Sequence, residues 1–201
     1  MPGRVVPGRG MRGAARFLLV CLALALAAGC ATRPPQAPLP ASNAGLQDFS
    51  LEGRVAVKVA QKGYSTNLRW RHSQAADALR LLSPVGTTIA TLDATPEGVT
   101  LVDADRQVHR SRDIEALTRE VLGWDLPLDG LKHWVLGRAD PGAPVDEQAR
   151  DDRNRLTRLR QSGWQIAYPA YAEDGALPAR LTLTREGLHL KLVIDRWEFP
   201  G

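Results

Sequence analysis

Residues 179–194 read ARLTLTREGLHLKLVI, and apolar side chains occupy every second position on both sides of a central turn. Leu181 and Leu183 alternate with threonines, and Leu190 and Leu192 belong to the alternation that follows the turn. A period of two is typical of a β-strand with one buried face, and a glycine-containing turn between two such runs favours a hairpin. We therefore predict an antiparallel hairpin here.

The same alternation recurs along most of the chain, in short runs separated by turn residues. The further predicted strands are RVAVKV (54–59), STNLRWRH (65–72), the segments 79–82 and 89–92, GVTLV (98–102), the segment around Val108, RLTRLRQ (155–161) and GWQIAYPAY (163–171). The last two flank Ser162-Gly163 and form a second predicted hairpin. These runs predict a mainly β fold.

Two adjacent segments have helical spacing instead. In DIEALTREVLG (113–123), Asp113 is suited to cap the start and Gly123 to end the helix. In PLDGLKHWVLG (127–137), proline occupies the first turn and a glycine again follows the apolar face. Helices this short are not stable alone in water. We expect both to lie against the sheet as a lid.

The N-terminal segment has the features of a secretory signal peptide. Residues 1–16 carry four arginines and no acidic residue, and 17–28 form an uninterrupted apolar run that ends in small side chains. Twelve helical residues span about 18 Å, well short of the roughly 30 Å of a bilayer's hydrocarbon core. This segment therefore predicts export rather than a transmembrane anchor.

Cys30 directly follows the apolar run, in the context Ala27-Ala28-Gly29-Cys30. This context resembles the lipobox of bacterial lipoproteins, in which the cysteine becomes residue one and its thiol accepts a diacylglyceryl group. Ala27 stands where leucine is usual in that motif. The alternative is an ordinary signal peptide cut near Ala28, which would leave a free cysteine. We favour the lipoprotein, because a lone cysteine in an exported chain has no partner for an internal disulfide.

Residues 1–29 are therefore expected to be the signal peptide, 30–45 a lipidated N-terminus and proline-rich tether, and 46–201 one β-domain. The chain has 26 basic and 22 acidic residues, and four of the basic residues lie in the signal peptide. The mature chain is thus formally neutral, which gives no support to nucleic-acid binding.

Signatures of catalysis and of metal binding are missing from the sequence. The four histidines have no HExxH or other ligand spacing, and neither a G-x-S-x-G motif nor a phosphate-binding loop occurs. Asp103 and Asp105 are interpreted as turn residues rather than as the start of a calcium loop. Arg150, Arg153, Arg155, Arg158 and Arg160 are interpreted as a solvated strand face rather than as a patch for lipid phosphates or an acidic partner, since Asp151 and Asp152 interrupt the run. We expect no cofactor and no metal.

A family resemblance extends over residues 49–199. The segments LLSPVGTTIATL (81–92), LGWDLPLDGLKHWVLG (122–137), GWQIAY (163–168) and LTLTREGLHLKLVIDRWEF (181–199), together with the lipobox, resemble the LolB family of Gram-negative bacteria. The most specific feature is the order Pro127-Leu128, Leu131, Trp134 and Gly137. The resemblance implies an incomplete antiparallel β-barrel under a helical lid, as in LolA and LolB, with an apolar cavity that holds acyl chains.

The resemblance also implies a function without catalysis. The protein would be anchored on the periplasmic face of the outer membrane, accept acylated lipoproteins from a soluble LolA-like periplasmic carrier, and insert them among outer-membrane phospholipids. Ala31 agrees with this location, because inner-membrane lipoproteins usually carry aspartate after the cysteine. We expect a monomer that does not bind nucleic acid.

The candidate cavity and lid residues are apolar side chains from the inward-facing strand positions and from the two helices: Val55, Val57, Leu68, Trp70, Leu79, Leu81, Leu117, Leu131, Trp134, Leu183, Leu190 and Leu192. Periodicity alone does not distinguish a filled core from an open pocket at these positions. Two alternatives therefore stay open: a lipid-anchored β-domain that serves as a scaffold or binding module of an envelope complex, and a periplasmic hydrolase.

The loop Ser83-Pro84-Val85-Gly86 connects two predicted strands. Serine, proline and glycine at its first, second and fourth positions fit a type I turn, whereas valine at the third disfavours the positive φ of type II. Type I turns do not match a tight two-residue hairpin, so we expect a longer, projecting loop. On these grounds Val85 lies either at an exposed tip or folded back on the sheet. The resemblance favours the tip, with Pro84, Val85 and Gly86 as a membrane-engaging loop.

Overall fold

The computed structural model describes residue 39 and residues 42–173 and 175–200, all of which belong to one compact unit, Ala37–Gly201. The predicted signal peptide, Cys30 and most of the predicted tether lie outside the described residues. Within them, no helix is both long enough and apolar enough to cross a membrane.

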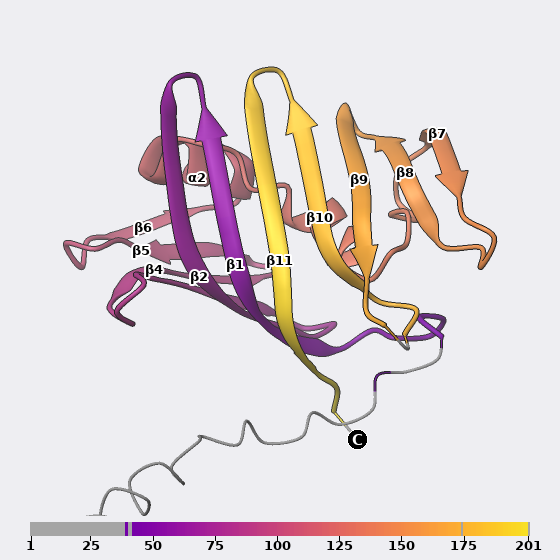
Figure 1. The fold of residues 1–201 in the computed structure, drawn as a ribbon. Coiled ribbons are helices and arrows are strands. Elements are labelled where there is room, and N and C mark those ends of the chain that lie inside the picture. The colour runs from indigo at the N-terminus through magenta and orange to yellow at the C-terminus, as the bar shows by residue number, and fades with distance from the viewer. Residues whose placement is uncertain (1–38, 40–41, 174, 201) are drawn as a thin grey trace, which may run out of the picture. The chain divides into compact units, whose positions relative to one another are not determined.

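One antiparallel sheet of eleven strands makes up most of the described domain (Figure 1). Its strand order is β6-β5-β4-β3-β2-β1-β11-β10-β9-β8-β7, so most neighbours in the sheet are also neighbours in the sequence. The strands are β1 (Phe49–Val59), β2 (Lys62–His72), β3 (Asp77–Leu82), β4 (Thr88–Thr95), β5 (Gly98–Val102), β6 (Val108–Ser111), β7 (Val145–Arg150), β8 (Leu156–Gln161), β9 (Trp164–Tyr171), β10 (Pro178–Arg185) and β11 (Leu188–Glu198). The central pair, β1 with β11, joins the two ends of the domain.

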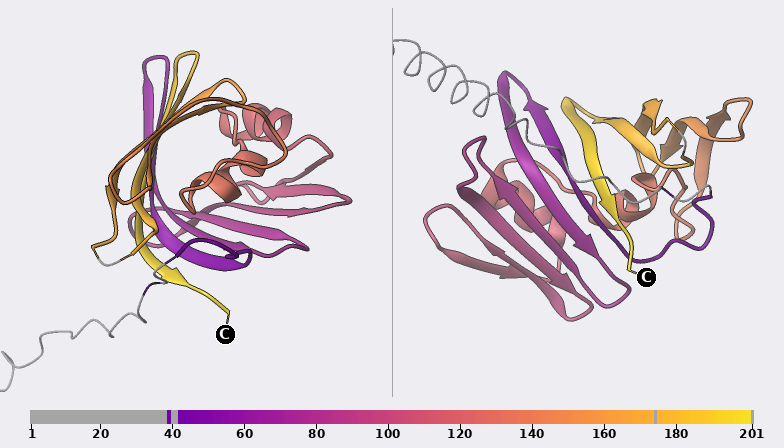
Figure 2. Two further views of the ribbon diagram at one scale, coloured as in Figure 1. Left: turned by 90° about the vertical axis from the view of Figure 1, so that its right-hand side faces the viewer. Right: turned by 60° about the horizontal axis from the view of Figure 1, so that its bottom comes forward.

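The sheet is strongly curved but not closed. Its terminal strands, β6 and β7, are not paired with each other, and the sheet curls around the helices like an incomplete barrel (Figure 2). The predicted fold class, mainly β with a few short helices in an incomplete antiparallel barrel, is confirmed. Gly53 in β1 lies at a bulge opposite β11, where a Cβ would overlap the carbonyl oxygen of Val193.

Both predicted hairpins are present with the expected strands. Leu183 lies opposite Leu190 in the β10–β11 hairpin, and Leu159 lies opposite Ile166 in the β8–β9 hairpin. All four of these side chains are buried, because the positions with a period of two face the helices.

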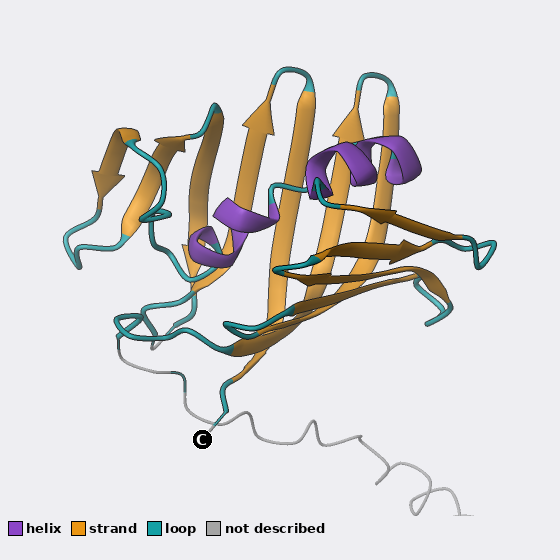
Figure 3. Ribbon diagram, turned by 180° about the vertical axis from the view of Figure 1, so that it is seen from behind, coloured by secondary structure: helices purple, strands orange, loops and turns teal. Residues whose placement is uncertain are grey.

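Two short helices, α2 (Ile114–Leu122) and α3 (Leu128–Trp134), lie on the concave face of the sheet (Figure 3). The Asp113 side chain accepts a hydrogen bond from the backbone N–H of Ala116, as predicted for the cap of α2. Gly123 ends α2 in the left-handed conformation, with φ of 80°. The second helix is shorter than the predicted segment: it ends at Trp134, Val135 keeps right-handed helical dihedrals as its C-cap, and the chain then turns through Gly137, which has φ of 72°.

Candidate functional site

An apolar cavity lies between the concave face of the sheet and the lid. Fifteen side chains line it: Val55, Leu68, Leu79, Leu81, Ala90, Thr91, Leu92, Leu101, Leu122, Trp124, Leu126, Leu131, Leu183, Leu190 and Leu192. All except Thr91 are apolar, so the cavity offers neither charge nor a fixed set of hydrogen-bond donors. Its chemistry suits hydrocarbon.

The cavity is small. Its volume is about 40 Å³. A fatty-acyl chain needs much more room than this. Entry of a chain therefore requires that part of the lid moves or that the lining side chains repack.

The structure brings most of the predicted cavity residues together. Eight of them line the cavity: Val55, Leu68, Leu79, Leu81, Leu131, Leu183, Leu190 and Leu192. Val57, Trp70, Leu117 and Trp134 are buried elsewhere in the same core and do not line it. Trp70 packs edge-on against Phe49, with ring centroids 5.0 Å apart.

Several lining residues were missed by the sequence analysis. Ala90, Leu92 and Leu101 lie in predicted strands, and their period of two could have identified them. Trp124 and Leu126 lie in the short connection between the two helices, where no periodicity marks an inward side. The sequence signal for an inward position was the presence of two large apolar side chains within a connection of only five residues.

The end of α3 and the loop after it are fixed to β8 by neutral hydrogen bonds to Gln161. The Trp134 indole N–H donates to Oε1 of Gln161 over 2.9 Å, and the same oxygen accepts from the backbone N–H of Asp140. The Gln161 amide donates to the carbonyl oxygens of Asp140 and Ala143, both at 2.8 Å. Gln161 is fully buried, and its amide group accepts two hydrogen bonds and donates two. The end of α3 is therefore a fixed part of the lid.

The helix α2 and the connection after it are held by ion pairs between side chains instead. The Arg185 Nη2 atom on β10 lies 3.0 Å from Oε2 of Glu115 and 2.6 Å from Oδ2 of Asp125. Its guanidinium also lies over the ring of Trp164, 4.4 Å from the centroid. Arg119 of α2 binds the other oxygen of Asp125 over 2.6 Å. The hydrogen bond from Arg119 lowers the pKa of Asp125 more than burial raises it.

The loop Ser83–Thr87 projects from the end of the β3–β4 hairpin. The Gly86 N–H donates to the carbonyl oxygen of Ser83 over 2.9 Å, Gly86 has φ of 87°, and Val85 is not among the residues of positive φ. This is the predicted type I turn, extended by a left-handed glycine. Val85 is 88% exposed, so it lies at the tip and is not folded back.

His72, His109 and His133 each lie beside a carboxylate. His72 Nδ1 and Trp70 Nε1 both lie 2.7 Å from Oδ1 of Asp77, which ties the ends of β2 and β3 together beside a hollow of about 300 Å³. The neighbouring hydroxyl of Ser73 donates to the carbonyl oxygen of Ala76 rather than to the imidazole. Burial lowers the pKa of His133, partly offset by Asp140.

Comparison with known proteins gives consistent matches over nearly all of the β-domain. Residues 47–197 match the family model described as outer membrane lipoprotein LolB. A protein named outer-membrane lipoprotein LolB from Thiobacillus denitrificans is 39% identical over 186 residues, covering 91% of this chain and 98% of that protein. A protein of the same name from Chromobacterium violaceum is 40% identical over 185 residues, with the same coverage of both chains.

Among solved structures, a LolA superfamily protein from Nitrosomonas europaea aligns over 78% of this chain and 88% of its own, with a TM-score of 0.49 and 7% identity. The family model and the extent of the curated matches identify the protein's family directly. This chain belongs to the LolB family of outer-membrane lipoproteins.

Proposed function

We propose that this protein is an outer-membrane-anchored acceptor, which takes lipoproteins from a soluble periplasmic carrier and inserts them into the outer membrane. Cys30 carries the lipid anchor, the apolar cavity binds the acyl chains of the cargo, and the loop at Val85 engages phospholipid. The observation that carries the proposal is a cavity lined, apart from Thr91, by apolar side chains under a lid whose two helices are attached by different means.

The transfer needs no catalytic residue. Each methylene removed from water contributes roughly 0.8 kcal/mol, so an acyl chain moves downhill from a weaker apolar site to a stronger one, and finally to the bilayer. The protein acts as a monomer and lowers no chemical barrier. This accounts for a site built from leucines with no convergent polar groups.

Acyl binding is tested with a charge placed in the cavity. Leu122 lines the cavity and is only half-buried, so lysine at this position should permit folding. Val121 is equally half-buried on the same helix but does not line the cavity, which makes Val121→Lys a matched control. We expect Leu122→Lys to weaken binding of a fatty-acyl probe strongly, because the ammonium would be desolvated beside the chain.

Equal binding by the two lysine variants and the parent would contradict an acyl-binding cavity. It would favour the scaffold alternative, in which the small interior volume reflects a filled core.

Insertion is tested by following two steps separately, acceptance from the carrier and delivery to liposomes. A glutamate at Val85 would have to enter the bilayer surface, which is costly for a carboxylate. Val85→Glu should therefore accept cargo normally and fail to deliver it. Val145→Glu is the control, because Val145 is also an exposed apolar residue but lies on the edge strand β7. Normal delivery by Val85→Glu would exclude a membrane role for this loop.

A further inference from the structure

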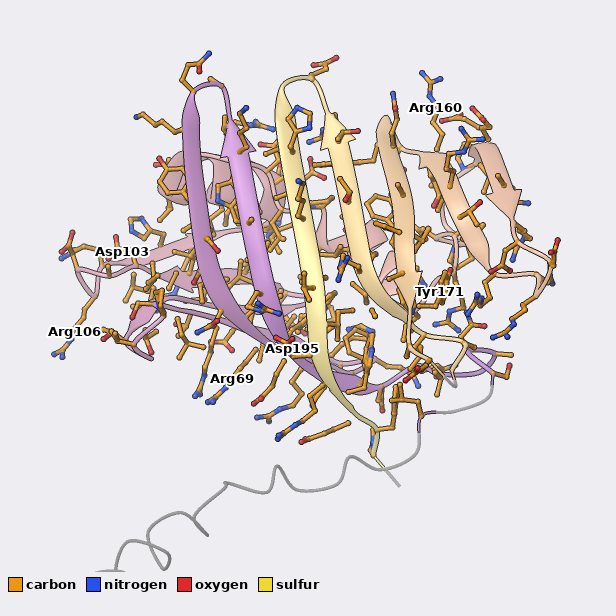
Figure 4. All side chains as sticks on the ribbon, viewed as in Figure 1. Arg69, Asp103, Arg106, Arg160, Tyr171 and Asp195 are labelled. Atoms are coloured by element: carbon orange, nitrogen blue, oxygen red, sulfur yellow. The ribbon has the colours of Figure 1, made fainter. Side chains whose placement is uncertain are left out.

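A hollow of about 250 Å³ lies on the face of the sheet turned away from the helices, across β3, β2, β1 and β11. Four arginines surround it: Arg69, Arg71, Arg80 and Arg196. Two carboxylates, Glu52 and Glu198, also line it, which leaves four positive charges against two negative ones. Figure 4 shows Arg69 extending outward from this face.

The strand register places three of the arginines in one row. Arg80 lies opposite Arg69, Arg69 lies opposite Glu52, and Glu52 lies opposite Arg196. Arg71 lies one row away, between the small side chains of Ala78 and Ser50, which leave the hollow open. Like charges directly opposite each other destabilise a sheet, so the Arg69–Arg80 pair has no structural benefit of its own.

The carboxylates only partly neutralise these arginines. Arg69 Nε lies 3.1 Å from Oε1 of Glu52, and Arg196 Nη1 lies 4.0 Å from Oε1 of Glu198. Among the described residues, Arg71 and Arg80 take part in no ion pair, and both are exposed. Two guanidinium groups thus remain available to an external anion, and the planar fork of donors on each matches the oxygens of a phosphate.

We propose that this arginine hollow binds the phosphates of phospholipid headgroups, and that it lies on the membrane surface together with the Val85 loop. The inference rests on the proposed membrane anchoring, and it adds a second contact with the same bilayer. Two features of the chain favour a membrane over a soluble acidic partner.

The first feature is that the hollow is close in the chain to the exposed Val85 loop. Strand β3 carries Arg80 and leads directly into the loop that exposes Val85, five residues further along the chain. An apolar residue for insertion beside basic residues for headgroups is the combination by which proteins bind bilayer surfaces.

The second feature is the distance from the anchor. Ser50 and Glu52 line the hollow and lie at the start of β1, where the tether joins the domain. Ser50 lies twenty residues after Cys30, and a chain of this length reaches at most about 70 Å when fully extended. The anchor therefore keeps the hollow within reach of the bilayer.

The test uses the mature chain with Cys30→Ala, so that the domain binds vesicles without its lipid. The probe is flotation with phosphatidylethanolamine–phosphatidylglycerol vesicles at several salt concentrations. The variant is Arg71→Gln with Arg80→Gln. Its control is Arg158→Gln with Arg160→Gln, two exposed arginines of β8 on the same face of the sheet but outside the hollow.

We expect partitioning of the Arg71/Arg80 variant to fall by about 30-fold, because each basic residue at an anionic surface contributes roughly fivefold. The control pair should change it much less. Conversion of both residues to lysine should restore only part of the loss, since lysine keeps the charge but loses the fork.

Equal losses in the variant and the control would overturn the proposal, because they would indicate general charge attraction. Unchanged vesicle binding would also overturn it, and a chemical-shift response to inorganic phosphate alone would then identify a soluble anion as the ligand. Failure of the proposed acyl binding is distinguishable, because the fatty-acyl probe assay uses no vesicles and should give the parent's result with the Arg71/Arg80 variant.

Discussion

Arg185 is expected to control how often the lid opens. Its guanidinium joins α2, through Glu115, and the connection between the helices, through Asp125, to strand β10. Replacement by alanine removes both ion pairs and the contact with the Trp164 ring. The neutral hydrogen bond of α3 to Gln161 is untouched, so only the α2 side of the lid should loosen.

The magnitude follows from the exposure of the groups. The Arg185 side chain is 24% exposed, Glu115 is 35% and Asp125 is 16%. The stabilisation by each ion pair is therefore near the upper end of the range of about 0.2–1 kcal/mol for surface pairs. The guanidinium over Trp164 adds about 0.5–1 kcal/mol. The total is about 2 kcal/mol, which corresponds to a roughly 30-fold increase in the population of the open lid.

Hydrogen exchange measures this population directly. In Arg185→Ala, amides of residues 114–126 should exchange about 30-fold faster than in the parent, while amides of the β1–β11 ladder report any global loss of stability. Arg180→Ala is the matched control, because Arg180 is an exposed arginine on the same strand. Unchanged protection of residues 114–126, or equal acceleration in the ladder and in the control, would refute the assignment of Arg185 as the lid's restraint.

Three further outcomes are expected. Asp125→Asn should destabilise the domain at neutral pH, because the variant lacks the carboxylate bound to Arg119. The difference in stability from the parent should vanish as pH falls below the ordinary carboxyl pKa of 3.8 and through the lowered pKa of folded Asp125, because the parent's carboxyl group is then protonated as well. Acid titration of both proteins by circular dichroism checks the sign. Gly130→Ala should cost about 1–3 kcal/mol of stability, because a Cβ would overlap the Trp134 ring, and a normal denaturation midpoint would exclude that overlap. Cys30→Ala should release a folded protein into the periplasm, and a variant that still pellets with outer membranes would show that acylation is not what localises it.

The strands were largely predictable because one buried face imposes a period of two. GVTLV was predicted over 98–102, and β5 has these bounds. Strand β7 was not predicted, and its sequence VDEQAR explains why. It is an edge strand whose side chains are nearly all exposed, so no buried face imposes a pattern on it, and its charges suit a protected edge.

The cavity was predictable only in part, because burial and position in a lining are different properties. Trp134 was predicted to line it on the basis of helical spacing and the family resemblance. The structure instead directs its indole to Gln161, a polar partner 27 residues away that no periodicity indicates. Arg185 likewise carries no sequence signal of its role, because that role depends on carboxylates 60 and 70 residues away.

The restraint that Arg185 places on the lid is weak compared with the burial of an acyl chain. Arg185 contributes about 2 kcal/mol to the closed lid, in addition to the buried apolar side chains of α2 and its connection, whereas each methylene that enters an apolar site gains roughly 0.8 kcal/mol. Burial of two or three methylenes therefore offsets the whole restraint of Arg185. Such a restraint cannot exclude an acyl chain that has begun to enter. In the proposed function, this restraint adds to the apolar packing that closes the cavity between transfers and keeps its leucine-lined surface out of water.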